Sequence, residues 1–180
     1  PDSRLENLTE LFNPKKEVHA TLEVVDIPGL QVGDDGKMKI TSDFLIKVKN
    51  NDLLLHVVRE FANDSVSHPE GRIDPLADIE FLETEFLLSD LEMVENRIEK
   101  LKKELMKTKT DKIMKEMSLF EVFKEHLENE KPLRTVNMDE NDLRLLSGYQ
   151  FLTMKPVIIG VNFSDESKGK VDELIAKIKV

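Results

Sequence analysis

The chain has 180 residues, of which 39% are hydrophobic and 34% charged, and it contains no cysteine. A chain of this length builds one sizeable core, and the missing cysteine excludes disulfides, thiolate metal sites and cysteine nucleophiles. The net charge of −10 disfavours affinity for nucleic acid over the whole surface, so we expect no DNA partner. The longest apolar runs are too short for a membrane span, and no secretion signal opens the chain. We therefore expect a cytoplasmic protein without a membrane partner.

The first third of the sequence predicts alternating helices and strands. Residues 2–12 place leucines on one helical face behind a capping aspartate. Residues 18–25 alternate at period two and predict a strand, and Thr41 or Ser42 caps a second helix. The continuous apolar run over residues 53–58 predicts a strand that is buried on both faces, as in a parallel sheet covered by helices.

The middle of the sequence carries a heptad pattern, which predicts a long helix packed along a partner. Its apolar positions are Leu87, Leu91, Val94, Ile98, Leu101 and Leu105. After a polar turn over residues 107–112, a second stripe consists of Ile113, Met117, Phe120, Phe123 and Leu127. The two stripes predict an antiparallel helical hairpin, a coiled-coil arm inserted over residues 76–130.

The last third returns to alternating elements. Residues 139–147 predict a short helix, residues 157–161 a buried strand, and residues 168–179 an amphipathic helix. The expected fold class is α/β, with a sheet covered by helices and one inserted arm. Residues 1–75 and 131–180 would then be the two parts of a single nucleotide-binding domain.

A motif of the form D-x-x-G follows the predicted strand over residues 18–25, as Asp26-Ile27-Pro28-Gly29. P-loop NTPases place a carboxylate here to hold Mg²⁺, usually through water, and a glycine that approaches the γ-phosphate. The alternative is an ordinary strand followed by a Pro-Gly turn, because the motif is short.

A second motif, Asn162-Phe163-Ser164-Asp165, follows the predicted strand over residues 157–161. Nucleotide-binding proteins place an N-K-x-D box at such a strand end, where its carboxylate pairs with the edge of the base, and open α/β sheets bind ligands there. The alternative is a polar turn that caps the next helix. No G-x-x-x-x-G-K-[ST] motif occurs in the chain, so tight triphosphate binding is not expected from it alone.

Several longer strings resemble the YchF/Obg-like ATPase family. They are VVDIPGL at 24–30, DLLLHVVREF at 52–61, GRIDPLADIE at 71–80, KPLR at 131–134 and LTMKPV at 152–157, in the family's order. The resemblance implies a P-loop NTPase of the translation-factor-related class that hydrolyses ATP, often in preference to GTP, with Mg²⁺, and that associates with ribosomes. Its phosphate-binding loop and its C-terminal domain would lie outside these residues.

The resemblance also implies roles for individual residues. Asp26 would help to hold Mg²⁺, and Gly29 would face the γ-phosphate, with Ile27 and Pro28 between them. Asn162 and Phe163 would lie beside the base, and Phe61 would border its adenine side.

Three departures from the family pattern matter. Leu30 stands where Ras-like proteins place a catalytic glutamine, and Gln31 is out of register, so slow hydrolysis by phosphate positioning is implied. The loop over residues 32–38 has fewer glycines and more acids than the family's second switch. Asp165 replaces the usual glutamate, which leaves the choice between ATP and GTP open.

Lysines gather around the predicted turn of the arm, at positions 100, 102, 103, 107, 109, 112 and 115. The candidates for contact with ribosomal RNA phosphates are Lys102, Lys103, Lys107, Lys109 and Lys112. The alternative is a solvated helix surface, with Glu99 and Lys103 paired one turn apart.

Two function classes follow. In the first, the chain is part of a nucleotide-binding hydrolase that regulates translation, seen here without its phosphate-binding loop and expected to be inactive alone. In the second, it is a non-catalytic module that binds RNA or protein through the helical arm.

The four histidines are dispersed and lack metal-ligand spacing.

Overall fold

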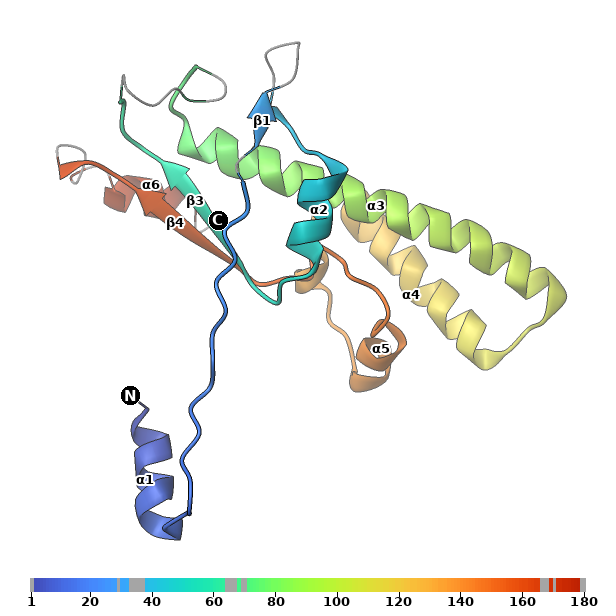
Figure 1. The fold of residues 1–180 in the computed structure, drawn as a ribbon. Helices are drawn as coiled ribbons and strands as arrows, with labels where there is room; N and C mark the ends of the chain where they lie inside the picture. The colour runs from blue at the N-terminus through green and yellow to red at the C-terminus, as the bar shows by residue number, and fades with distance from the viewer. Residues whose placement is uncertain are drawn as a thin grey trace.

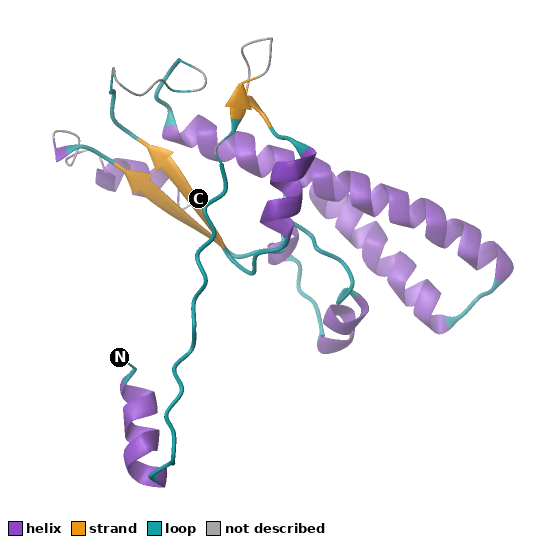
Figure 2. Ribbon diagram, in the orientation of Figure 1, coloured by secondary structure: helices purple, strands orange, loops and turns teal. Residues whose placement is uncertain are grey.

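The computed structural model describes residues 2–28, 30–32, 38–63, 68, 71–165, 169 and 171–178. The chain contains both helices and strands, with a run of helices between β3 and β4 (Figures 1 and 2). The elements are α1 (Ser3–Phe12), β1 (Gln31–Val32), β2 (Met38–Lys39), α2 (Ser42–Lys49), β3 (Leu54–Arg59), α3 (Pro75–Lys107), α4 (Asp111–Glu128), η1 (Leu133–Thr135), α5 (Glu140–Leu145), β4 (Val157–Asn162) and α6 (Val171–Ile178).

A two-stranded parallel sheet joins segments that lie far apart in the sequence. Its strands are β3 and β4, whose register runs from Leu54 opposite Val157 to Arg59 opposite Asn162. The strands predicted at 53–58 and 157–161 are therefore confirmed, each within one residue of its bounds. Because the pairing is parallel, both strands end at the same edge of the sheet.

The predictions that β3 is buried on both faces and that β4 is a buried strand are wrong: no residue of β4 is buried, and Ile158 is 52% exposed. Val58 is 4% exposed and His56 is half-buried on the face that meets α3, whereas Leu55 and Val57, on the other face, are 60% and 61% exposed. An apolar run indicates that a strand can be buried on both faces. Whether the second face is buried depends on another element that packs against it.

The long helix α3 and the helix α4 pack along each other, joined by a turn at residues 108–110 (Figure 1). Asp74 caps α3 by accepting a hydrogen bond from the Ala77 amide, and Thr110 caps α4 through the Ile113 amide. Six positions of the predicted stripes are buried in the core between them, together with residues that follow α4: Val94, Ile98, Leu101, Phe120, Phe123, Leu127, Leu133, Leu146 and Phe151. Four further stripe positions are partly buried against this core, and Leu105 is not a member of it.

A second, smaller core joins the base of α3 to the sheet side of the molecule. Its buried members are Val48 of α2, Leu82 and Phe86 of α3, and Leu152. Partly buried side chains pack against it from the preceding segments: Ile27, Ile40, Phe44, Leu45 and Leu54. We call these residues the base core.

The strand predicted over residues 18–25 is not present. After α1, whose predicted cap Asp2 is confirmed, the chain runs to residue 28 without helix or strand (Figure 1). Leu22 and Val24 are 87% and 81% exposed. Alternating apolar residues show how a segment would sit in a sheet, but a strand also needs a neighbour for its hydrogen bonds, and none of the described residues supplies one.

The remaining elements follow the sequence closely. Asp139 caps α5 with a capping box, and α5 ends at Leu145, two residues before its predicted end. The predicted helix over 168–179 is observed as α6, although residues 168, 170 and 179 lie outside the described part of the chain. No described helix is both long and apolar enough to cross a bilayer.

Candidate functional site at the carboxyl edge of the sheet

The parallel register brings three of the predicted site residues to one edge. Arg59 lies opposite Asn162 at the strand ends, and the Glu60 amide donates a hydrogen bond of 2.8 Å to the Asn162 carbonyl. Phe61 and Phe163 follow directly after these residues. The structure therefore places Phe61, Asn162 and Phe163 together, as the ligand-binding edge of an open α/β sheet requires.

Arg59 is a member of this edge that the sequence analysis missed. Its guanidinium carbon lies 5.9 Å from the centroid of the half-buried Phe61 ring, within the range of a cation–π contact. Residues two apart in an extended chain share a face. The sequence did carry a signal for this contact: Arg59 stands two positions before an aromatic residue at the end of an apolar strand.

The turn after β4 presents polar groups to solvent. Asn162 and Asp165 are exposed, Phe163 is 39% exposed, and Ser164 is half-buried. The side chains that we expect beside a base are therefore accessible to a ligand. The alternative interpretation, a polar turn that binds no ligand, would expose the same side chains.

A buried acid, Asp78, lies in the first turn of α3, and half-buried histidines lie near it. His68 contacts Asp78 at 3.1 Å between Nε2 and Oδ2. Among the described residues, two buried side-chain oxygens lack a hydrogen-bond partner, one on Glu60 and the other Oδ1 of Asp78. Burial lowers the pKa of His56, against the opposing charges of Asp78 and Glu83.

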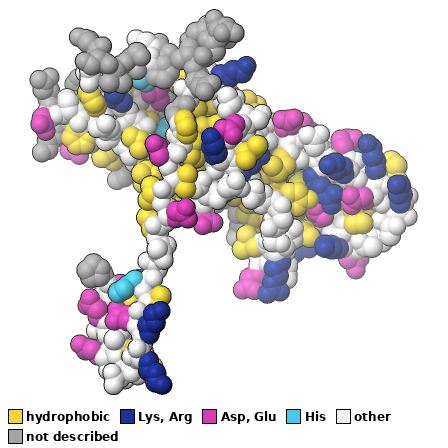
Figure 3. All heavy atoms as spheres, viewed as in Figure 1, with side chains coloured by type: hydrophobic (Ala, Val, Ile, Leu, Met, Phe, Trp, Pro, Cys, Tyr) yellow, Lys and Arg dark blue, Asp and Glu magenta, His cyan; other side chains and the backbone are white. Residues whose placement is uncertain are grey.

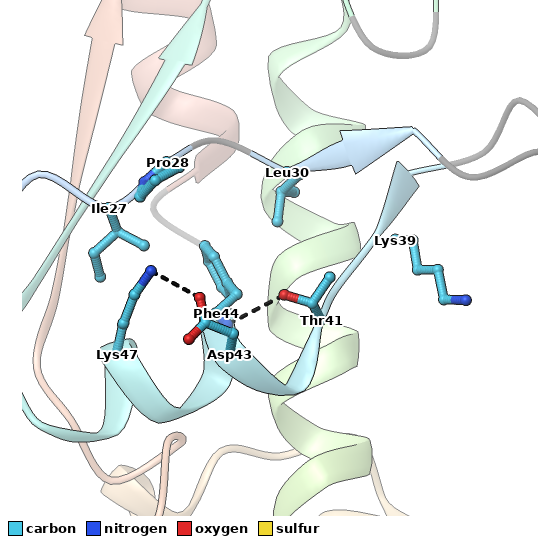
Figure 4. A pocket seen from close by; sticks show the side chains of 8 residues that line it. All are labelled: Ile27, Pro28, Leu30, Lys39, Thr41, Asp43, Phe44 and Lys47. Atoms are coloured by element: carbon cyan, nitrogen blue, oxygen red, sulfur yellow. Dashed lines mark hydrogen bonds and ion pairs between the residues drawn. The ribbon is translucent and has the colours of Figure 1, made fainter.

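The D-x-x-G segment contacts the base core through one residue. Asp26 is exposed, while Ile27 is half-buried and packs against the base core. Gly29 and residues 33–37 of the predicted switch loop lie outside the described residues. Ile27 and Pro28 line a pocket of about 220 Å³, together with Leu30, Lys39, Thr41, Asp43, Phe44 and Lys47 (Figure 4).

This pocket combines an apolar floor with two lysines. Lys47 pairs with Asp43 at 2.7 Å, and the Thr41 hydroxyl accepts a hydrogen bond of 3.2 Å from the Phe44 amide, which caps α2 (Figure 4). A volume of this size is below that of pockets that enclose a whole small ligand, about 300–1,000 Å³. The pocket therefore borders the D-x-x-G motif without being a nucleotide cavity by itself.

The two motifs are not joined within the described residues. No hydrogen bond or ion pair among them connects Asp26 with Asn162, Phe163 or Asp165. No group of three His, Asp or Glu side chains that could hold a metal lies in this part of the chain. An exposed single carboxylate fits Mg²⁺ bound through water, because Mg²⁺ keeps several waters and takes its other ligands from phosphates.

The lysines at the arm turn divide into paired and unpaired groups. Lys102 pairs with Glu99 at 3.1 Å, so the expected Glu99–Lys103 pair is not formed, and Lys115 pairs with Asp142 at 2.8 Å. No ion pair joins Lys103, Lys107, Lys109 or Lys112 to another described residue, and all four are exposed. We call these four residues the lysine tip.

No protein-family model matches the chain, whereas individual proteins match nearly all of it. It is 38% identical over 167 residues to the ribosome-binding ATPase YchF of Haemophilus ducreyi, covering 93% of this chain and 46% of that protein. It is 37% identical over 181 residues to YchF of Bacillus subtilis, covering 99% and 49%. Obg-like ATPase 1 of Oryza sativa subsp. indica is 35% identical over 179 residues, covering 99% and 45%.

A solved structure agrees with these matches. The Schizosaccharomyces pombe YchF GTPase superposes with a TM-score of 0.67 at 26% identity, covering 98% of this chain and 50% of that one. The chain spans about half the length of the relatives it matches.

Proposed function

Because the chain belongs to the YchF/Obg-like ATPase family, we propose that it supplies part of the nucleotide site of a ribosome-associated ATPase or GTPase with a P-loop NTPase-like fold. The observation that carries this proposal is the shared edge of β3 and β4, where Arg59 and Asn162 lie opposite each other. It puts an aromatic residue and an asparagine where sheets of this class bind ligands. The names of the relatives support the nucleotide and the ribosome.

In this proposal the sheet edge binds the base. Asn162 and Phe163 lie beside it, Asp165 pairs with its edge, and Phe61 borders its flat face with Arg59 stacked behind. An ionised carboxylate only accepts hydrogen bonds, so the base must present N–H donors to Asp165. The preference for adenine or guanine therefore depends on which base places its donors opposite this side chain.

The D-x-x-G segment would face the phosphates. Asp26 would hold Mg²⁺ through water, and Ile27, Pro28 and Gly29 would bring the backbone toward the γ-phosphate. When bound, Mg²⁺ neutralises charge on the phosphate oxygens. The packing of Ile27 against the base core supports a fixed position for Asp26. We expect no hydrolysis by this chain alone, since it carries no G-x-x-x-x-G-K-[ST] sequence.

The test is binding of fluorescent ATP and GTP, with Mg²⁺, to this chain and to the longest natural polypeptide that contains it. We expect the longer polypeptide to bind, and Asn162→Ala to weaken binding about tenfold or more by removing a hydrogen-bonding side chain at the base. Asn96→Ala, an exposed asparagine on α3, is the matched control. Unchanged affinity of Asn162→Ala, or no binding by either polypeptide, would refute the assignment.

A second candidate function is carried by the lysine tip. We propose that the α3–α4 hairpin is an inserted coiled-coil arm whose tip contacts ribosomal RNA, with Lys102 at its border. The tip lysines, which form no ion pair with described residues, contrast with a chain whose net charge is −10. The face in Figure 3 shows several blue side chains at the far end of the arm, with magenta side chains among them. Such binding would place the protein in the cytoplasm. The same tip would serve a non-catalytic module equally well.

The salt dependence of ribosome binding tests this assignment. Reversing two tip charges with Lys107→Glu and Lys109→Glu should weaken binding and reduce the slope of log K against log salt by about 2. The matched control reverses Lys15 and Lys16, which are exposed and lie just after α1. Equal losses from both double variants would indicate a nonspecific charge effect and remove the tip from the proposal.

A further inference from the structure

One carboxylate in the middle of α3 is completely buried. Asp90 is 0% exposed and accepts hydrogen bonds from the Leu152 amide at 3.0 Å, from the Thr153 amide at 2.7 Å and from the Thr153 hydroxyl at 2.7 Å. Burial raises the pKa of Asp90, and the hydrogen bonds from Thr153 and Leu152 oppose that rise. A buried acid with this many donors fixes the backbone that it binds.

Thr153 extends the contact to the segment that leaves the arm. Its hydroxyl oxygen accepts a hydrogen bond of 3.2 Å from the Leu133 amide, and its carbonyl accepts one of 3.1 Å from the Arg134 amide. The segment that leads into β4 is thus held to Asp90 directly, and the segment that leaves α4 is held to it through Thr153.

The residues held by Asp90 lie beside Ile27 of the D-x-x-G segment and shortly before β4, the strand whose far end carries Asn162. Leu152 is buried in the base core, against which Ile27 of the D-x-x-G segment packs. Pro156, just before β4, accepts a hydrogen bond of 3.0 Å from the Leu54 amide, and the Lys155 ammonium donates one of 2.5 Å to the Asn51 carbonyl. Val157, the first residue of the sheet register, therefore lies four residues after Thr153.

We propose that Asp90 is a positioning residue that ties the helical arm to the nucleotide site, by fixing Leu152 and Thr153 between the base core and β4. The inference rests on the proposed function only where it calls that region the nucleotide site. It assigns to the arm a link through the Asp90 carboxylate to the segment beside Ile27 and to the start of β4, in addition to the direct packing of Leu82 and Phe86 in the base core.

The experiment compares Asp90→Asn with the wild-type chain in the absence of nucleotide. Asparagine keeps only one acceptor oxygen, so its NH2 group faces either the Leu152 amide or the Thr153 donors, and amide hydrogen exchange in β4 should rise about tenfold or more. In methyl NMR spectra the Ile27 signal should shift or broaden, whereas the signal of Ile113, at the far end of the arm core, should stay in place.

Two controls separate positioning from a general loss of stability. Glu116→Gln removes another buried acid, 6% exposed, whose partners are Arg97 and Tyr149. It should lower the melting temperature without moving the Ile27 signal. Thr153→Val should reproduce the effect of Asp90→Asn, and Thr153→Ser, which keeps the hydroxyl, should restore wild-type exchange.

Three outcomes would overturn the proposal: unchanged β4 exchange in Asp90→Asn, an Ile27 shift of equal size in Glu116→Gln, or no rescue by Thr153→Ser. None of these measurements involves a nucleotide. If nucleotide binding fails but the exchange and NMR results are as expected, Asp90 remains the link between the arm and the sheet. If nucleotide binding succeeds but those results fail, the nucleotide site remains without this link.

Discussion

The phenol of Tyr149 donates a hydrogen bond of 2.7 Å to the carboxylate of Glu116, which joins the segment after α5 to the inner side of α4. Arg97 of α3 donates to the same oxygen at 2.7 Å. Burial by itself would raise the pKa of Glu116, but the bonds from Arg97 and Tyr149 outweigh it and lower that pKa. The arm and the α5 segment therefore share one ionised, hydrogen-bonded contact.

This contact makes Tyr149 a reporter of the folded arm. Burial, followed by the hydrogen bond to Glu116, raises the pKa of Tyr149 to about 12. Since the folded pKa is above the unfolded value of about 10, the stabilisation is fully present below pH ~10 and is lost as pH rises toward ~12. Tyr149 is the only tyrosine and the chain has no tryptophan, so ultraviolet absorbance follows it directly. Glu116→Gln should lower the midpoint; an unchanged midpoint would contradict this cause.

The arm core should respond strongly to truncation. Leu101 is 0% exposed and lies in the core with Phe120 and Phe123. Leu101→Ala should cost about 2–5 kcal/mol in the free energy of unfolding, by lost burial and a residual cavity. Met106→Ala, five residues later and 86% exposed, should change it by less than about 0.5 kcal/mol. Urea unfolding followed by circular dichroism measures both, and similar losses would mean that the two residues are equally buried in solution.

Neighbouring valines in β3 test which face of the sheet is covered. Val58 is 4% exposed and Val57 is 61% exposed. Val58→Thr should destabilise the fold by about 1–3 kcal/mol, because it buries a hydroxyl at an apolar site, and Val57→Thr should be nearly neutral. Thermal unfolding of the two variants compares them at equal volume. A large loss from Val57→Thr would show that the outer face is covered by other atoms in solution.

His56 should make the fold sensitive to mild acid. Burial lowers its pKa, against the opposing charges of Asp78 and Glu83, so the folded state favours the neutral imidazole. Its contribution is fully present above the unfolded pKa of about 6.5 and is lost as pH falls through the lowered folded value. Between pH ~7 and ~5 the wild-type chain should therefore lose more stability than His56→Gln in urea titrations. Parallel losses would exclude His56 as a cause.

The helices were predictable because their information is local. The heptad positions Val94, Ile98 and Leu101 are buried as predicted, since a helical stripe defines its own face whatever it packs against. The capping aspartates Asp2 and Asp139 were predictable for the same reason: each bonds to an amide only two or three residues away.

The strands and the polar contacts depended on distant residues. Residues 18–25 carry a strand pattern without a neighbour to pair with, and β3 carries an apolar run with one uncovered face. Asp90 was missed, although it lies four residues after Phe86 and four before Val94, on a face whose other members are buried. An acid within such a stripe is a recognisable signal, but its partners, Leu152 and Thr153, are more than sixty residues away.

The uninterrupted course of α3 gives the arm the properties of a lever. The helix has 33 residues, and Asp90 lies near its middle, with the lysine tip at one end and the base core around the other. At 1.5 Å per residue, about 25 Å separate Asp90 from Lys107, so a tilt of about 10° around Asp90 displaces the tip by about 4 Å. Asp90 is then the pivot of the helix. A small repacking of Leu82 and Phe86 at the base would move the tip by a distance greater than the length of a hydrogen bond.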